Sequence, residues 1–322
     1  MGTCLAMPRS GARVLLAGRT RRERQQLRAG ISLRSFTISD ATRRRYEAAV
    51  GLILPFLEEH GLVDCDQLVS EWIECQWVRG ESVNVIADCL SGLHFFLPEI
   101  RGSLRQSWRL FRSWRRVETP CRAPPLTPEL VKAMIARAVD QNHIAFATML
   151  AIGFHALLRT GELLALQFQD VEFADTCGVI TLKSSKSGLR HGTEEAVALR
   201  DGLTLSLLET LFSVQEHGPG NKLWPFSAQC FRETFQKYLR FFRLSGLSFK
   251  PYSLRRGGAT FLLQSGTPLD VILLRGRWHS LSVARLYLED GMAQIPAIRI
   301  PPEDRPRIAM WAAHCPKTAF RP

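Results

Sequence analysis

The chain has 322 residues, of which 46% are hydrophobic, and its formal net charge is +12. This length and apolar content allow two domains with real cores, and no apolar run approaches the roughly 20 residues that span a bilayer, so we exclude a membrane partner. The basic balance predicts attraction to a polyanion, because each Lys or Arg that neutralises a phosphate releases a condensed counterion, although charge alone equally fits a merely basic soluble protein.

Residues 1–36 form a basic arm in which Glu23 is the only acid. Because no apolar periodicity is visible, we predict that the arm is flexible. It is expected to bind the DNA backbone or to act as a nuclear localisation signal. The alternative is an organelle transit peptide, which is also Arg-rich and acid-poor. The arginines of this arm are Arg9, Arg13, Arg19, Arg21, Arg22, Arg24, Arg28 and Arg34.

Residues 37–117 are predicted to form a compact helical domain. Its first helix follows the N-cap groups of residues 37–40, and Pro55 is expected to kink or end it. Further apolar periodic segments lie at Leu68–Trp77 and Val83–Phe96. The helical spacing in the first helix is carried by Tyr46, Val50, Ile53 and Leu57.

The last segment of this domain, Leu104–Val117, mixes arginines with aromatic residues. The purely structural interpretation is a helix with one buried aromatic edge and a solvated basic face. The functional interpretation is a DNA-facing helix whose arginines pair with phosphates, and both can hold. The aromatic residues are Trp108, Phe111 and Trp114, and the arginines are Arg105, Arg109, Arg112, Arg115 and Arg116.

A proline-rich linker at residues 118–126 precedes a second domain, residues 127–292. This domain opens with Thr127 as a helix N-cap and Pro128 in the first turn. It is mostly helical, with short strands at 178–183 and 194–199 around a polar turn, and a proline-rich tail follows at 293–322. The expected fold class is therefore mainly α with a small antiparallel β-hairpin or sheet.

Eight cysteines are scattered singly, and none forms a C-x-x-C pair. They are interpreted as small core-filling residues in a reducing compartment, and neither a zinc site nor a disulfide framework is expected. The motifs HExxH, GxGxxG and the P-loop are also absent from the sequence, so we expect no metal and no cofactor.

Arg159 follows the apolar segment Ile144–Leu158 and precedes Glu162. A buried arginine at a helix end needs an anionic partner, because an unpaired buried charge is costly. Either the two residues form a structural ion pair, or Glu162 orients Arg159 towards a phosphate.

Arg255 and Arg256 stand near the start of another predicted helix, where arginine opposes the helix dipole. Two arginines there suggest an anion site, and Gly257 and Gly258 allow close backbone approach. The alternative is that both arginines simply contact solvent.

Two further candidates are a lysine and a tyrosine. Lys186 lies in the predicted hairpin turn, where it is either solvated or able to deliver a proton to a leaving oxygen, and Lys183 is its rival near the strand. Tyr287 belongs to a predicted amphipathic helix, Leu281–Leu288, where a tyrosine is most often a half-buried core residue. Tyr252 is the other tyrosine near an arginine-rich motif.

Taken together, the order and spacing of these motifs resemble the catalytic domain of tyrosine recombinases, the phage-integrase family, over residues 127–292. The preceding helical domain resembles, more loosely, the family's core-binding domain. The residues of these motifs are most similar to those of eukaryotic mobile-element recombinases of the Crypton and DIRS type. The resemblance is carried by HALLRTGELLAL, TLKSSKSGLRHG, YSLRRGGAT and GRWHSLSVARLYL.

The resemblance implies roles for the residues that bind the phosphate. Arg159 and Arg255 match the two catalytic arginines, which clamp phosphate oxygens where negative charge is held in the transition state. Glu162 matches the acidic neighbour of the first arginine. Lys186 matches the hairpin lysine that protonates the departing 5′ oxygen, with a shift to Lys183 left open.

Tyr287 matches the nucleophile, and Trp278 falls at the His-or-Trp position nine residues before it, which leaves His279 as a bystander. One departure is Tyr252, which stands where the family usually has histidine. It is expected to accept or relay the proton of the nucleophile, but with a pKa near 10 a tyrosine is a poorer base than histidine.

The implied activity is site-specific DNA cleavage and rejoining through a 3′-phosphotyrosyl intermediate. The implied partners are duplex DNA, contacted by the arginines of 104–117 and by Arg256, and three further copies in a DNA-bound homotetramer. The tail after Met292 is expected to dock on a neighbouring subunit. Two alternatives are a type IB topoisomerase-like nicking–closing enzyme and a domesticated DNA-binding protein that has lost catalysis.

Overall fold

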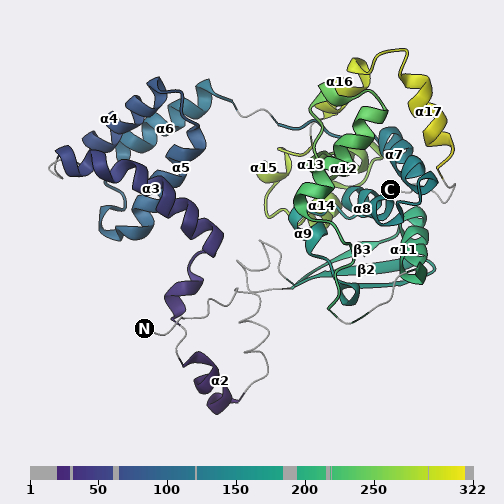
Figure 1. Cartoon of the computed structure of the whole chain (residues 1–322), viewed down its shortest axis with the longest axis horizontal. Helices are drawn as coiled ribbons and strands as arrows, with labels where there is room; N and C mark the ends of the chain where they lie inside the picture. The colour runs from purple at the N-terminus through teal and green to yellow at the C-terminus, as the bar shows by residue number, and fades with distance from the viewer. Residues whose placement is uncertain are drawn as a thin grey trace. The chain divides into compact units, whose positions relative to one another are not determined.

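A computed structural model of the chain divides into two compact units, Met1–Cys121 and Arg122–Pro322 (Figure 1). The division falls within the predicted linker, residues 118–126. The residues that the structure describes are 20–29, 32–60, 65–119, 122–183, 194–214, 218, 220–288 and 290–315.

The basic arm contains a helix, α2 (Arg21–Arg28), followed by a short 3₁₀ helix, η1 (Leu33–Phe36). This helix was not predicted, and the flexibility of the arm stays a prediction. Thr20 and Glu23 form a capping box, in which the Thr20 N–H donates to Glu23 Oε2 at 2.7 Å and the Thr20 hydroxyl accepts from the Glu23 N–H. Local capping and helix-favouring Arg and Gln residues form this helix without a buried face.

Four longer helices build the core of the N-terminal unit, as the apolar spacing predicts. Val50, Ile53 and Leu57 of the first helix are buried. Pro55 does not end this helix, which continues to His60. The elements are α3 (Asp40–His60), α4 (Cys65–Val78), α5 (Val83–Phe96), η2 (Pro98–Ile100) and α6 (Arg105–Val117).

Helix α6 has one buried aromatic edge and one exposed basic face. Phe111 and Trp114 are buried, at 7% and 4% exposure, whereas all five arginines of the helix are exposed. Asp66 of α4 caps the start of α6, because its carboxylate accepts from the N–H groups of Gln106 and Ser107 at 2.8 and 2.9 Å. The cap and the aromatic edge fix α6 on the core and leave its arginines in solvent.

The C-terminal unit is mostly helical and carries one small sheet, so the predicted fold class is confirmed. Thr127 caps the first helix, with its hydroxyl accepting from the Leu130 N–H at 3.3 Å. The helices are α7 (Pro128–Asp140), α8 (Ile144–His155), α9 (Thr160–Ala165), α11 (Gly202–Val214), α12 (Ala228–Phe241), α13 (Tyr252–Gln264), α14 (Leu269–Gly276), α15 (Leu281–Ala284), α16 (Asp290–Arg299) and α17 (Arg305–Ala313), with 3₁₀ turns η3 (Phe168–Asp170) and η4 (Ser245–Leu247).

The sheet has three antiparallel strands in the order β1-β2-β3. Val171, Ile180 and Val197 pair across it and are all buried, so one face covers the core. The sequence predicts the second and third strands and misses the first, whose four residues are too few to show alternation. The strands are β1 (Val171–Ala174), β2 (Cys177–Leu182) and β3 (Glu195–Leu199).

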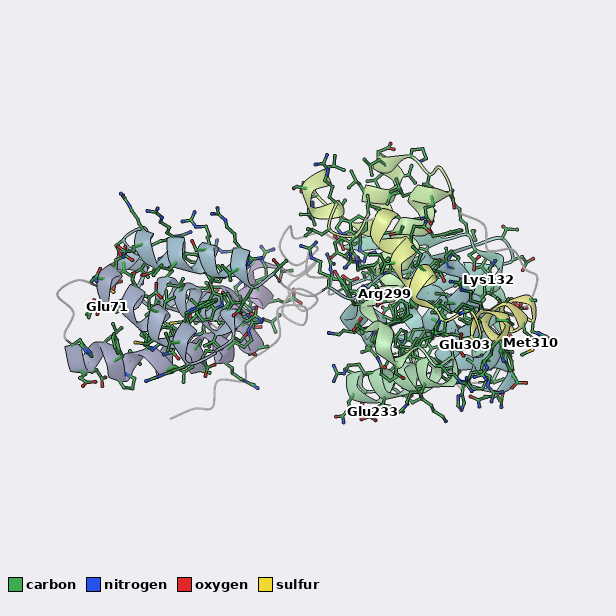
Figure 2. The ribbon with its side chains drawn as sticks, turned by 90° about the horizontal axis from the view of Figure 1, so that it is seen from above. Glu71, Lys132, Glu233, Arg299, Glu303 and Met310 are labelled. Carbon is green, nitrogen blue, oxygen red and sulfur yellow. The ribbon has the colours of Figure 1, made fainter. Side chains whose placement is uncertain are left out.

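The predicted proline-rich tail, residues 293–322, contains most of α16, which begins at Asp290, and all of α17. Pro306 lies in the first turn of α17, where a missing N–H costs nothing. Helix α17 packs against α7 of the same chain, and Figure 2 labels Lys132 and Met310 on these two helices. Ile308 is buried in this contact.

At two glycines, helix α13 approaches neighbouring backbone too closely for any Cβ to fit. A Cβ at Gly257 would stand 2.2 Å from the Leu126 carbonyl oxygen, and one at Gly258 would stand 1.9 Å from that of Phe154. Close backbone approach, as expected of these glycines, therefore brings Arg255 of α13 beside the chain that leaves α8.

Within the described ranges, no helix is long and apolar enough to cross a membrane. The same residues contain no cluster of His, Cys, Asp and Glu that could hold a metal ion. Cys89 and Cys315 are buried, but Cys75, Cys177 and Cys230 are exposed, so the prediction that the cysteines fill the core is wrong for these three.

Candidate active site

Arg159 lies at the N-cap of α9 and is held by Glu162 one turn later. Its guanidinium Nη1 is 2.5 Å from Glu162 Oε1, and its backbone N–H donates to Glu162 Oε2 at 2.9 Å. The side chain of Glu162 is 7% exposed, whereas that of Arg159 is 29% exposed. The ion pair exists, and it leaves part of the guanidinium open to a ligand.

Arg255 is fully buried on α13, so the alternative that it contacts solvent is wrong. Its Nη1 donates to the carbonyl oxygen of Leu157, and its Nη2 donates to that of Gly276 at 2.6 Å. Burial, with the nearby charges of Arg277 and Arg159, lowers the pKa of Arg255 to about 10, so it stays charged at neutral pH.

Tyr287 lies beside this guanidinium, whose central carbon is 5.3 Å from the tyrosine ring centre. The predicted helix Leu281–Leu288 is confirmed for its first half only, because α15 ends at Ala284 and a tight turn follows. In this turn the Tyr287 N–H donates to the Ala284 carbonyl at 2.8 Å, an i to i+3 bond. Thr260 of α13 also anchors the turn by donating to the Tyr287 carbonyl at 3.2 Å.

Trp278 forms the apolar wall of the site. Its ring centre is 4.6 Å from that of Tyr287 and 5.0 Å from the Arg255 guanidinium carbon. The indole Nε1 is buried, and no described residue accepts its hydrogen bond. The Trp278 ring, tilted by 36° to that of Tyr287, packs against the tyrosine side chain.

Tyr252, the first residue of α13, donates a hydrogen bond from its hydroxyl to the hydroxyl oxygen of Tyr287. Burial, together with this hydrogen bond, raises the pKa of Tyr252 above its ordinary value. At neutral pH Tyr252 is therefore a neutral phenol in contact with the tyrosine that the sequence assigns as nucleophile.

Arg277 is a member of this cluster that sequence reasoning missed. Its Nη2 is 2.6 Å from Glu162 Oε2, and its Nε is 3.3 Å from Glu195 Oε2. In the sequence, Arg277 is marked only by its place next to Trp278. Arg275, two positions earlier, is an equally good candidate on sequence alone.

The remaining candidates lie elsewhere. Lys186 is outside the described residues. Lys183 follows β2 and places its Nζ 2.6 Å from Asp170 Oδ1, an ion pair that engages its charge. Arg256 is 2% exposed, and its contact with DNA stays a prediction.

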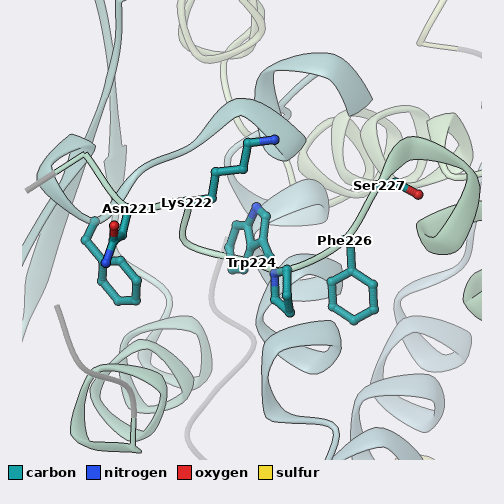
Figure 3. A pocket seen from close by; sticks show the side chains of 7 residues that line it. Asn221, Lys222, Trp224, Phe226 and Ser227 are labelled. Atoms are coloured by element: carbon teal, nitrogen blue, oxygen red, sulfur yellow. The ribbon is translucent and has the colours of Figure 1, made fainter. Parts of the chain in front are cut away.

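A surface hollow of about 530 Å³ lies apart from this cluster (Figure 3). Trp224, Phe226 and Lys222 line it, and none of its lining residues belongs to the arginine cluster. The Trp224 indole N–H donates to the Leu163 carbonyl at 2.6 Å. Trp224 therefore supports α9, the helix that begins at Arg159.

Burial by itself raises the pKa of Glu162, but Arg277 and Arg159 outweigh it and hold the pKa below the ordinary 4.5. A carboxylate with a depressed folded-state pKa stabilises the fold fully above pH 4.5, and this contribution is lost as the pH falls through the folded pKa.

We expect Glu162→Gln to lower the free energy of unfolding by about 3 kcal/mol at neutral pH, because two guanidinium groups lose their anion. The deficit should shrink as the pH falls below 4.5. Thermal unfolding of both proteins across this range measures it. If the loss of unfolding free energy in Glu162→Gln stays constant with pH, the charge of the Glu162 carboxylate does not stabilise the fold.

The two buried arginines, the partly exposed Arg159 and a half-buried tyrosine form the arrangement expected of a phosphoryl-transfer site. The model of the Phage integrase family matches residues 125–293, more than half of the sequence. The chain therefore belongs to the phage integrase family, and the resemblance inferred from the motifs is confirmed.

Similar proteins agree with this assignment. The tyrosine recombinase XerD of Pseudomonas putida is 25% identical over 272 residues, which cover 80% of this chain and 89% of XerD. The Tn1549 transposon integrase in complex with circular intermediate DNA has a TM-score of 0.58 at 14% identity, covering 88% of this chain and 98% of that one. A lambda integrase dimer bound to a core site has a TM-score of 0.55 at 16% identity, covering 79% and 90%.

Proposed function

We propose that this protein cleaves and rejoins duplex DNA at specific sites through a 3′-phosphotyrosyl intermediate on Tyr287. The observation that carries the proposal is the position of Tyr287, with its hydroxyl bonded to Tyr252 and its ring beside the buried Arg255 guanidinium. Membership of the phage integrase family favours this function over the nicking–closing and inactive alternatives.

In the proposed reaction, the Tyr287 oxygen attacks phosphorus while the bond from phosphorus to the 5′ oxygen breaks. For this step the hydrogen bond between the two tyrosines reverses: Tyr287 passes its proton to the Tyr252 oxygen while Tyr252 passes its own proton to solvent water, and the departing 5′ oxygen gains a proton from Lys186. A 5′ hydroxyl then attacks the phosphotyrosine and releases Tyr287, so the bond energy is kept and no nucleotide is consumed.

Arg159 and Arg255 stabilise the charge on the non-bridging oxygens during both steps. Two carbonyl oxygens hold Arg255 and Glu162 holds Arg159, so the protein itself orients both guanidinium groups. The Trp278 indole N–H supplies a further donor at the same place.

A nicked suicide duplex tests the proposal. Duplexes that the protein retains are first selected from a random pool, and a nick is then placed next to the inferred cleavage position so that the 5′ hydroxyl diffuses away. We expect wild-type protein to accumulate a covalent adduct on a peptide that contains Tyr287. If no selected duplex yields an adduct, the proposed function is wrong.

The exposed arginines of α6 provide a second contact with the same duplex, through its phosphates. We expect replacement of Arg109, Arg112 and Arg116 by alanine to reduce the slope of log affinity against log salt by about 0.9 for each phosphate that is no longer neutralised. Arg45→Ala is the matched control, because Arg45 is already paired with Asp88 at 2.6 Å. An unchanged slope in the triple variant would place the duplex elsewhere.

Three properties extend the proposal. The protein assembles as a homotetramer on two synapsed duplexes, with the segment after Met292 contacting a neighbouring subunit in addition to its own α7. It acts in the nucleus, with an organelle as the alternative, and it derives from a mobile element. The arginine-rich arm supports the nuclear or organelle location, and the residues of the motifs support the mobile-element origin. Measuring the molecular mass of the DNA-bound complex tests the homotetramer.

A further inference from the structure

Arg277 occupies a backbone conformation that is unfavourable for its residue type. It is the C-cap of α14, with φ 54° and ψ 46°, the left-handed region that normally favours glycine. The glycine of this turn stands one position earlier, because a Cβ at Gly276 would lie 2.3 Å from the Trp278 ring. The turn therefore accepts an arginine in the left-handed position, and its side chain must compensate.

The Arg277 side chain is 5% exposed and contacts oxygen atoms of three separate segments. Nη2 bonds Glu162 Oε2 at 2.6 Å and the Leu157 carbonyl at 3.4 Å, and Nε forms the ion pair with Glu195 of β3. A planar guanidinium can span such a set, whereas the single nitrogen of lysine cannot.

These contacts tie Arg277 to both arginines of the proposed site. Glu162 uses Oε2 for Arg277 and Oε1 for Arg159, so one carboxylate holds both guanidinium groups. The Leu157 carbonyl accepts from Arg277 and also from Arg255. Arg277 is thus the shared neighbour of two side chains that come from different helices.

The local charge agrees with a role in positioning. Three arginines face two carboxylates, Glu162 and Glu195, which leaves one formal positive charge for an anion. Both carboxylates contact Arg277, while Arg159 remains 29% exposed. Arg277 is therefore neutralised by protein, and Arg159 is left to meet the phosphate.

We infer that Arg277 is a positioning residue of the proposed strand-cleavage reaction: it fixes Glu162, and through it Arg159, without touching the phosphate itself. The inference rests on the proposed function and adds a residue to it. Because a misplacement of about 1 Å far from the reacting atoms can cost on the order of 100-fold in rate, we expect Arg277→Ala to slow adduct formation by about that factor.

A double-mutant cycle tests the route through Arg159. If Arg277 acts by holding Glu162 and Arg159, Arg277→Ala should have little further effect on adduct formation in an Arg159→Ala background. Losses that multiply would show an independent contact with the phosphate and overturn the inference. Arg277→Lys repeats the cycle if the alanine variant fails to fold, with an expected loss of about tenfold because lysine keeps one of the contacts.

A matched control separates backbone strain from side-chain contacts. Arg243 is also left-handed, at φ 57°, but its side chain is 64% exposed. We expect Arg243→Gly to leave adduct formation unchanged and Arg277→Gly to slow it as much as Arg277→Ala does, although glycine suits both backbones. Full activity of Arg277→Gly would overturn the inference.

A measurement without DNA keeps this inference distinct from the proposed function. Carboxyl-carbon NMR of Glu162 should show its pKa rising towards the ordinary 4.5 in Arg277→Ala, and no change in Arg243→Gly. An unmoved Glu162 pKa contradicts the positioning role. Absence of any adduct in wild type, with the pKa still shifted, contradicts only the proposed function.

Discussion

Replacing Tyr287 by phenylalanine is expected to abolish the covalent protein–DNA adduct. The substitution removes the one oxygen that attacks phosphorus, and loss of a nucleophile elsewhere costs on the order of a millionfold, so the rate should fall to background. The ring remains, with its contacts to Trp278 and the Arg255 guanidinium, so folding and duplex affinity should change little. Denaturing gels with the nicked duplex measure the adduct, and equilibrium binding measures the affinity.

Two control variants sharpen this result. Tyr46→Phe, in the N-terminal unit, should form adduct at the wild-type rate. Tyr252→Phe removes the hydroxyl that contacts Tyr287 and should slow adduct formation by roughly tenfold to a hundredfold without abolishing it. Adduct retained in Tyr287→Phe and lost in Tyr252→Phe would reverse the roles of the two tyrosines and contradict the proposed mechanism.

The sequence predicts most of this site, because phosphoryl-transfer chemistry fixes residue types and order along the chain. Arg159, Arg255, Trp278 and Tyr287 are recognised by motif and separation, and the structure connects the last three by direct contacts. Arg159 joins them through Glu162 and Arg277. The apolar spacing of α3, α4 and α5 likewise predicts their buried faces.

Other features depend on contacts that a local pattern cannot show. Arg277 is defined by contacts with oxygen atoms of Leu157, Glu162 and Glu195, far away in sequence. The turn at Tyr287 has the same apolar spacing as a helix, and the two differ in the i to i+3 hydrogen bonds of the turn. Helix α2 forms through its own cap, which a search for buried periodicity overlooks.

The second large effect is expected at Arg255. Arg255→Lys should reduce the rate of adduct formation by about 10² to 10³-fold, the usual cost of removing one donor to a developing oxyanion. The guanidinium bonds the carbonyls of Leu157 and Gly276 with separate nitrogens while it still faces Tyr287. The single ammonium of a lysine cannot reach both carbonyls and a phosphate. A buried carbonyl therefore loses its hydrogen-bond donor, which lowers the free energy of unfolding by about 1–3 kcal/mol.

The dependence on pH distinguishes this explanation from simple misfolding. Wild-type Arg255 keeps its charge until about pH 10, so its contribution should be constant through the neutral range. A lysine buried at the same place has its pKa lowered by desolvation, so the deficit of Arg255→Lys should deepen as the pH rises. Arg232→Lys, at an exposed position of α12, is the control and should match wild type throughout. A deficit independent of pH would mean that the charge of residue 255 is not what stabilises the transition state.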